Sequence, residues 1–290
     1  MLNKKIERRT YKKAGTLKAF PFIMPSLCGI VLFYLLPYLD VIKRSFSSPV
    51  TGVFTGLENY QMVFENEAFQ LAAKNTVRFI VTCVPLLVLS SLVVAVILQK
   101  CVKGKFLKIV FLFPVAIPVV SVVLLWKDVF DVQGFLNSFL NLLGVSGNDW
   151  MNTKSAFWVL VFSYIWKNMG YFIILWLASL ASIPKEIYEA AKIDGSGEIR
   201  CFLYITIPNL LPYFFTITVI SIINSFKVYR EAYLVAGDYP DQSIYMMQHL
   251  FNNWFRNLSL DKLAVGAVIN TAIFVILVWG FWKGWGKMDE

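Results

Sequence analysis

The stretch IPKEIYEAAKIDGSGEIRCFLYITIPNLLP, residues 183–212, is a polar segment between two long apolar ones. Apolar and charged residues alternate with helical period over 185–193, and Pro184 suits a helix start. Gly195 permits the left-handed backbone geometry that ends many helices. A second short helix, at about 198–205, is expected before the next apolar segment. The stretch therefore predicts a compact knob of two short amphipathic helices or, more simply, an elbow on a membrane surface.

Six apolar segments lie on either side of this stretch. Each approaches or exceeds the roughly 20 residues that a helix needs to cross a bilayer. They are residues 19–42, 76–98, 106–126, 156–183, 208–229 and 263–282. The first contains three prolines, which membrane helices tolerate where neighbours satisfy the freed carbonyls. We expect an all-α membrane protein with six transmembrane helices over 19–282, including a cytoplasmic loop at 184–208.

The composition agrees with membrane insertion and argues against other classes. The chain has 290 residues, of which 58% are hydrophobic and 16% charged. Soluble proteins average nearer a quarter charged, so one soluble core is not expected. The net charge of +9 is not accompanied by a motif that reads nucleic acid. We therefore expect contact with membrane lipid and none with nucleic acid.

Lysine and arginine also predict the orientation. Positive residues favour the cytoplasmic side of a membrane. A cytoplasmic, basic N-terminal segment at 1–18 and six spans place the tail, 283–290, in the cytoplasm too. The connections then predicted to be cytoplasmic hold Lys100, Lys103, Lys105, Lys108, Lys185, Lys192, Arg200, Lys283 and Lys287. The outer connections are poorer in these residues, which favours an in–in topology.

Metal and nucleophilic chemistry are not indicated. Cys28, Cys83, Cys101 and Cys201 have neither paired nor metal-ligand spacing. His249 is the single histidine. We expect no catalytic residue, no metal site and no cofactor bound by this chain.

The polar stretch resembles a family signature. Glu189-Ala190-Ala191, then Gly195, then Ile205-Thr206-Ile207-Pro208 resembles the EAA motif of bacterial ABC-importer permeases, EAA-x3-G-x9-I-x-L-P. Every spacing fits, and isoleucine replaces leucine at residue 207. The resemblance implies the fold of a type I ABC importer permease, in which this knob is a coupling helix that sits in a cleft of an ATPase subunit.

The resemblance also implies where ATP is hydrolysed. The sequence has no G-x4-G-K-[ST] phosphate-binding loop. ATP and Mg are therefore expected on partner ATPase subunits. The residues implied in ATPase coupling are Glu189, Ala190, Ala191, Asp194, Gly195, Ile205 and Pro208.

Further segments resemble carbohydrate permeases of the maltose-transporter type. These are residues 20–46, GLENY at 56–60, and EAAKIDG at 189–195, while YLVAGDYPDQSIYMMQHL at 233–250 resembles the MalF-like partner. The resemblance implies a sugar-importing permease in a bacterial cell membrane. It also implies a second homologous (MalG-like) permease, two ATP-binding subunits and an extracytoplasmic solute-binding protein.

A sugar pathway needs polar and aromatic groups that line a cavity within the membrane. By resemblance, Tyr164, Asn168, Ser221 and Ser225 line it, and Asn224 is added because it neighbours them. The alternative is that these groups join helices by hydrogen bonds. Lys167 and Lys227 could meet an acidic substrate group, or extend to the membrane surface or pair with a carboxylate.

Three alternatives to sugar import stay open. The same machinery could import glycerol phosphate or another solute. An ion-coupled secondary transporter would need carboxylates within the spans, and these are almost absent apart from Asp40. A membrane enzyme would need a nucleophile and base, which no pattern provides.

The outer segment 237–262 has helix-like apolar spacing, which fits an interfacial helix or a docking surface for an external partner.

Overall fold

A computed structural model describes residues 21–49, 51–100, 104–228, 230, 232–233, 237 and 239–286. The predicted N-terminal segment 1–18 and the end of the tail, 287–290, lie outside the described residues. So do Cys101, Lys103 and the last residue of the predicted fifth span. Apart from one isolated bridge between Ser47 and Phe54, the regular structure in the described ranges is helical.

The chain forms two compact units. Unit 1 comprises Met1–Phe64 and Leu258–Ala272, and unit 2 comprises Glu65–Asn257 and Ile273–Glu290. Unit 1 contains a helix from Pro21 that continues as α2 (Leu36–Ser45), nearly all of α3 (Glu58–Glu65) and the first part of α14 (Leu260–Gly286).

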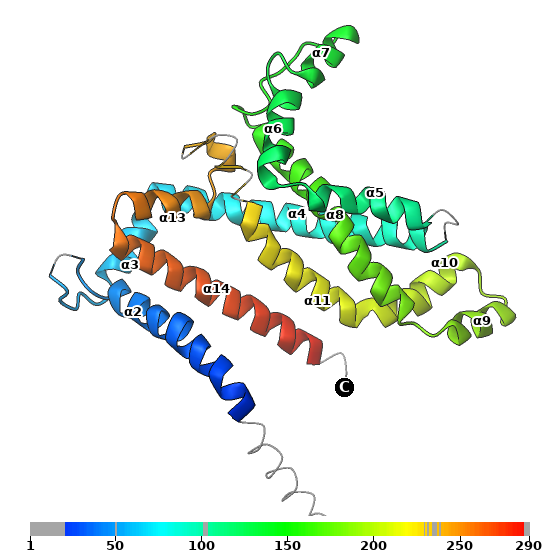
Figure 1. Ribbon diagram of the computed structural model, residues 1–290, viewed down its shortest axis with the longest axis horizontal. Helices are drawn as coiled ribbons and strands as arrows, with labels where there is room; N and C mark the ends of the chain where they lie inside the picture. The colour runs from blue at the N-terminus through cyan, green and yellow to red at the C-terminus, as the bar shows by residue number, and fades with distance from the viewer. Residues whose placement is uncertain are drawn as a thin grey trace, which may run out of the picture. The chain divides into compact units, whose positions relative to one another are not determined.

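Unit 2 contains the remaining helices (Figure 1). They are α4 (Glu67–Lys100), α5 (Gly104–Ala116), α6 (Val119–Phe130), α7 (Phe135–Leu142), α8 (Ala156–Ala181), α9 (Lys185–Ile193), α10 (Glu198–Cys201), α11 (Ile207–Ser225) and α13 (Met247–Arg256). Short helical turns join some of them.

Five described helices are long and apolar enough to cross a membrane: Pro21–Ser45, Glu67–Lys100, Ala156–Ala181, Glu198–Ser225 and Leu260–Gly280. They contain or overlap five of the six predicted spans. The chain is therefore a multi-pass membrane protein.

The predicted third span, 106–126, is wrong as one continuous helix. The chain is helical over Phe106–Ala116 and again from Val119, and the two helices meet at 94°. Pro118 adopts φ −56° and ψ 142° at the break. Proline has no backbone N–H and disfavours the helical conformation of the residue before it, so the helix ends here. At most, the bent pair forms one broken span.

Prolines also explain two widened turns. Val31–Leu35 and Phe202–Thr206 are π-helical, and each lies just before a proline, Pro37 or Pro208. A proline ring clashes with the carbonyl four residues earlier in a regular helix. The wider turn, in which Ile207 N–H donates to the Phe202 carbonyl, relieves this crowding and lets the helix continue.

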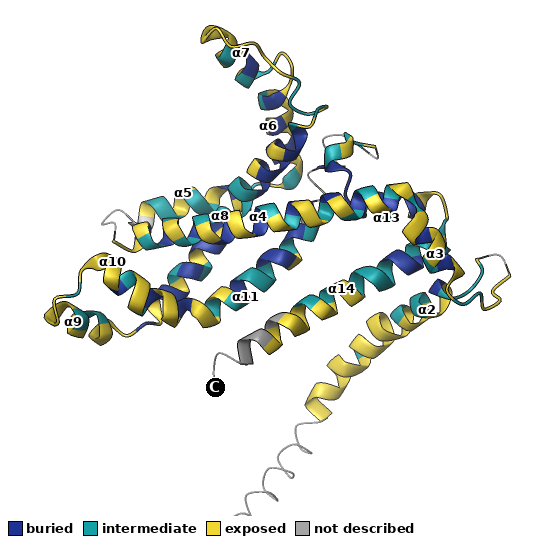
Figure 2. Ribbon diagram, turned by 180° about the vertical axis from the view of Figure 1, so that it is seen from behind, coloured by how far each residue is buried: buried dark blue, intermediate teal, exposed yellow. Residues whose placement is uncertain are grey.

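The core of unit 2 lies where α4, α8 and α11 pack together (Figure 2). Trp176 on α8 is fully buried, and its indole N–H donates to the Val88 carbonyl on α4 over 3.1 Å. Gly170 on α8 lies against the backbone of α5, where an added Cβ would overlap the carbonyl of Phe111. Small residues allow such close approach between membrane helices.

At each end of unit 2, segments that were predicted to lie on the same side of the membrane are in contact. Lys100 Nζ at the end of α4 lies 2.6 Å from Glu198 Oε2 at the start of α10. At the other end of α4, Asn75 Nδ2 donates to the carbonyls of Gln242 and Tyr245. The proposed cytoplasmic connections thus meet at one end, and two proposed outer segments meet at the other.

The sequence GLENY has a structural role in unit 1. The Asn59 side-chain amide donates to the carbonyls of Ser45 and Ser47, at 3.1 and 2.9 Å. The Tyr60 hydroxyl lies 2.9 Å from the Ser45 hydroxyl, and its ring packs on Phe46. These contacts attach the start of α3 to the end of α2.

Candidate functional site: a projecting helix and a polar cavity

The predicted knob helix forms as α9, with the predicted bounds. Gly195 has φ +76°, which confirms the predicted left-handed geometry after the helix. Ser196 N–H donates to the Ala191 carbonyl and Gly195 N–H to the Lys192 carbonyl. This pair of bonds is the Schellman motif, which satisfies carbonyls that the helix end leaves free. The helix therefore stops at a defined residue.

The predicted second helix at 198–205 is helical, but it is continuous with the next span. α10 passes through the π-turn into α11, giving one helix over Glu198–Ser225. The wide turn before Pro208 removes the need for a break there. The knob is therefore one projecting helix, α9. It is attached to the base of the fifth predicted span, by which we mean the N-terminal part of the helix Glu198–Ser225 before Pro208.

Tyr188 anchors α9 to that base. Its hydroxyl lies 2.9 Å from the Thr206 hydroxyl, and Thr206 is buried. The Tyr188 ring packs against the core of unit 2. This tyrosine directly precedes the motif, and the alternation of apolar and charged residues did not predict its polar partner.

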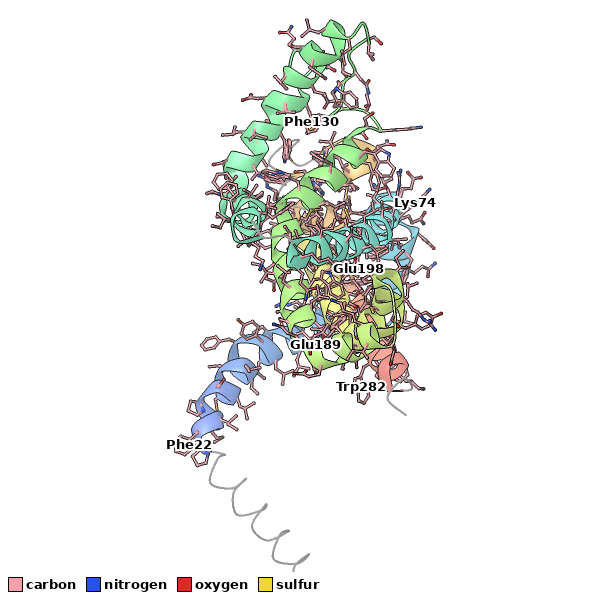
Figure 3. The ribbon with its side chains drawn as sticks, turned by 90° about the vertical axis from the view of Figure 1, so that its right-hand side faces the viewer. Phe22, Lys74, Phe130, Glu189, Glu198 and Trp282 are labelled. Atoms are coloured by element: carbon pink, nitrogen blue, oxygen red, sulfur yellow. The ribbon has the colours of Figure 1, made fainter. Side chains whose placement is uncertain are left out.

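The residues of the predicted coupling motif are largely on the surface. Glu189 on α9 is exposed, as are Ala190, Asp194 and Gly195, whereas Ala191 is half-buried (Figure 3). Ile205 is half-buried and Pro208 exposed. No residue of α9 is buried, and Ile193 at its end is 87% exposed. The helix thus presents both apolar and charged groups that this chain leaves uncovered.

A polar cavity of about 350 Å³ lies near the end of α11 in unit 2. Three of the five predicted pathway residues, Tyr164, Asn168 and Asn224, line it together. The other lining residues are Val115, Val119, Lys167, Tyr171, Val228 and Arg230. Sites for small ligands typically occupy about 300–1,000 Å³.

The break between α5 and α6 positions one wall of the cavity. Val115 and Val119 lie on either side of the break, and both line the cavity. Non-helical backbone within a membrane is tolerated where it is covered by protein or lines a water-filled space. Gly170, between Asn168 and Tyr171 on α8, lets α5 approach closely enough to form this wall.

The structure does not bring Ser221 and Ser225 into this cavity. Ser221 is fully buried, and its hydroxyl has no hydrogen-bond partner among the described residues. Ser225 Oγ donates to the Ile222 carbonyl over 2.6 Å. Asn224 and Val228, one turn apart, form the part of the cavity wall at the end of α11.

Charged residues of the cavity are basic. Lys167 comes from α8 and Arg230 from the segment after α11, and the described lining includes no aspartate or glutamate. The sequence pattern singled out Lys167 but not Arg230, which lies beyond the expected span. The side chain of Lys227 lies outside the described part.

The outer segment contains α13, which packs on α4. Phe69 and Trp254 stack with ring centroids 6.3 Å apart, and Met247, His249 and Leu250 are buried. Much of the apolar face that favoured an interfacial helix is therefore covered within the protein.

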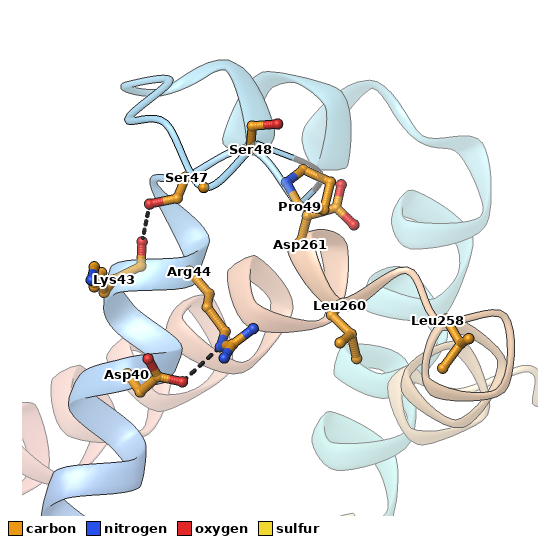
Figure 4. A pocket seen from close by; sticks show the side chains of 10 residues that line it. Asp40, Lys43, Arg44, Ser47, Ser48, Pro49, Leu258, Leu260 and Asp261 are labelled. Carbon is orange, nitrogen blue, oxygen red and sulfur yellow. Dashed lines mark hydrogen bonds and ion pairs between the residues drawn. The ribbon is translucent and has the colours of Figure 1, made fainter.

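A second cavity, of about 270 Å³, lies in unit 1 (Figure 4). An ion pair between Arg44 Nε and Asp40 Oδ2, 2.6 Å apart, forms part of its wall, and Asp261 also lines it. Its charges include both signs and are paired at least in part.

Within the described ranges, no three His, Cys, Asp or Glu side chains form a group suited to a metal ion.

Comparison with known proteins agrees with this architecture. The model of the family "Binding-protein-dependent transport system inner membrane component" matches residues 16–282. The trehalose/maltose transport system permease protein MalF of Thermococcus litoralis is 30% identical, with 88% of each chain covered. The arabinooligosaccharides transport system permease protein AraP of Bacillus subtilis is 29% identical, covering 90% of this chain and 86% of that protein.

Other relatives and solved structures extend the comparison. The sn-glycerol-3-phosphate transport system permease protein UgpA of Salmonella typhimurium is 28% identical, with 88% of this chain and 89% of that protein covered. A chain of a bacterial ABC transporter that imports the acidic polysaccharide alginate has the same fold. It matches with a TM-score of 0.80 and 19% identity, over 100% of this chain and 99% of that one.

Proposed function

The chain belongs to the family of inner membrane components of binding-protein-dependent transport systems, and on that premise we propose that it is a permease subunit of an ATP-driven saccharide importer. Named relatives serve trehalose and maltose, arabinooligosaccharides and sn-glycerol-3-phosphate. The lining of the cavity suits a saccharide, because it includes two tyrosines, Tyr164 and Tyr171, and two side-chain amides, Asn168 and Asn224.

One observation carries the proposal: a single helix connects the knob to the cavity. Thr206, which holds Tyr188 of α9, and Asn224, which lines the cavity, lie on the continuous helix Glu198–Ser225. At about 1.5 Å per residue they are roughly 27 Å apart. Movement of α9 by a partner would therefore be transmitted to the cavity wall through one packed element.

The exposed surface of α9 supports an ATPase partner. Glu189 is available for an ion pair, and Ile193 for apolar contact, neither being covered by this chain. The proposed assembly has a second, homologous (MalG-like) permease, two ATP-binding subunits that hold ATP and Mg, and an extracytoplasmic solute-binding protein. A solved alginate transporter that resembles this chain in fold was determined with its ligand-bound periplasmic protein. In the proposed orientation, α9 and both termini face the cytoplasm.

Site-directed variants of α9 test the proposal. Glu189→Arg should abolish most saccharide uptake by cells that express the complete transporter and should reduce co-purification of the ATPase. Lys154→Glu, a charge reversal at an exposed residue outside α9, is the control for charge. Normal uptake and normal ATPase recovery in Glu189→Arg would contradict the coupling assignment.

A further inference from the structure

The cavity near the end of α11 has an unusual charge for a space within a membrane protein. Lys167 and Arg230 line it from two different segments, and the seven other lining residues are apolar, aromatic or amide. Lys167 lies within the predicted fourth span, where ionisable residues are rare and, when they line a water-filled space, mark substrate or ion pathways. Arg230 is exposed and lies just beyond the predicted fifth span. Among the described lining residues, the two charged side chains are therefore both basic.

A positive cavity favours an anionic ligand. Fixed charges of one sign in a space with low-dielectric walls raise the local concentration of the opposite charge. An arginine guanidinium matches the geometry of carboxylate and phosphate oxygens, and a lysine ammonium adds a compact point charge. A neutral saccharide would need neither group.

The remaining lining residues favour a sugar as the body of that ligand. Tyr164 and Tyr171 on α8 are aromatic lining residues, and the side-chain amides of Asn168 and Asn224 can both donate and accept hydrogen bonds. Asn168 Nδ2 is partly engaged by the Tyr164 carbonyl at 2.8 Å, which fixes the direction of its side chain. The hydroxyl groups of a sugar ring would pair with the amides, and one acidic group on the ligand would pair with the basic side chains.

We propose that this permease transports an acidic saccharide, one that carries a carboxylate or a phosphate group, and that Lys167 and Arg230 recognise that group. The inference rests on the proposed function and narrows its substrate class. The second cavity does not compete for this role, because its basic residues lie beside Asp40 and Asp261.

The test compares matched substrates in proteoliposomes that contain the complete transporter with its binding protein. Uptake is measured for neutral di- to tetrasaccharides, for the corresponding uronic-acid oligosaccharides and for the corresponding sugar phosphates. The wild-type complex should import at least one acidic series at least 10-fold faster than the neutral series. The carboxylate and phosphate arms distinguish the two sources of charge.

Variants of the permease separate its own selectivity from that of the binding protein. Lys167→Gln and Arg230→Gln should each lower the ratio of acidic-saccharide to neutral-saccharide uptake about 10-fold or more. Lys167→Arg, which keeps the charge, should retain most of the activity. Lys154→Gln removes an exposed charge outside the cavity and should have no effect, with the binding protein unchanged throughout.

The outcomes are distinct. Preferential import of neutral saccharides by the wild-type complex would overturn the inference while leaving saccharide import intact. An acidic-to-neutral ratio that stays constant in both glutamine variants, each recovered in the membrane at wild-type level, would also overturn it. Absence of ATP-dependent uptake for every saccharide would instead overturn the proposed function.

Discussion

The hydroxyl oxygens of Tyr188 and Thr206 lie 2.9 Å apart and link the projecting helix α9 to the base of the helix Glu198–Ser225. Thr206 is buried and Tyr188 is half-buried, so this bond is partly buried. Under the proposed function, this hydrogen bond would carry a displacement of α9 to the helix Glu198–Ser225. The pair is therefore the joint on which the proposed coupling depends.

Removing the tyrosine hydroxyl should weaken the joint. Tyr188→Phe and Thr206→Val are each expected to lower saccharide uptake about 2- to 10-fold, because one hydrogen bond contributes on the order of 0.5–1.5 kcal/mol. The double variant should be little worse than either single one, since both remove the same interaction. Tyr204→Phe is the control because Tyr204 is 75% exposed. Additive losses in the double variant would show that the two hydroxyls act separately.

Gly195 should tolerate substitution poorly, because its backbone lies in the left-handed region. Gly195→Ala is expected to cost about 1–2 kcal/mol in the local structure and to reduce uptake, while Gly195→Asn should be milder. Gly197→Ala is the matched control, because Gly197 has φ −71° and an added Cβ would meet nothing within 4 Å. Uptake assays at equal membrane expression measure both effects. Equal activity of the alanine variants at 195 and 197 would exclude a role for the helix stop.

Close packing at Gly170 should determine stability as well as cavity shape. In Gly170→Ala the new methyl group overlaps the backbone of Phe111, which cannot move independently of α5. Overpacking of this kind costs about 1–3 kcal/mol. Thermal melting of the detergent-solubilised protein should show a lower midpoint. Gly280→Ala, in a helix with nothing near the added methyl group, should melt like the wild type; a similar drop there would remove the packing explanation.

Asn59 should be important for the stability of unit 1. Asn59→Ala leaves the carbonyls of Ser45 and Ser47 without their side-chain donor. The loss is expected to cost about 1–3 kcal/mol because Asn59 is buried. Asn141→Ala, at an exposed position on α7, is the control. Limited proteolysis of the loop at 51–57 should accelerate in the first variant only, and unchanged cleavage would contradict the anchoring role.

Hydrophobicity predicted the membrane spans well because bilayer thickness imposes a length that the sequence displays directly. The helix over 185–193 and its glycine stop were also predictable, since both depend on local backbone preference. The third span was wrong as one continuous helix, and the second knob helix was predicted as helical but wrongly as separate from the next span. Both errors arose at prolines: Pro118 breaks a helix that looks continuous by hydropathy, and Pro208 is accommodated by a wide turn that hydropathy does not reveal.

The cavity was predictable only in part. Tyr164, Asn168 and Asn224 were expected to face a common space, and they line one cavity. Ser221 and Ser225 occupy other faces of α11, because helical spacing relates residues within one helix but does not say which face meets a neighbour. The contributions of Gly170 and Arg230 to the cavity depend on contacts between segments distant in sequence. No local sequence pattern therefore identified these two residues.

The central claim is that ATP drives saccharide import through this chain, and the most direct test is uptake into proteoliposomes of the complete transporter. With labelled acidic saccharide and its binding protein outside, uptake should require ATP and Mg inside and should be unaffected by ionophores. The account predicts no accumulation when ATP is omitted. Accumulation driven by an imposed proton or sodium gradient without ATP, and abolished by an ionophore, would contradict it.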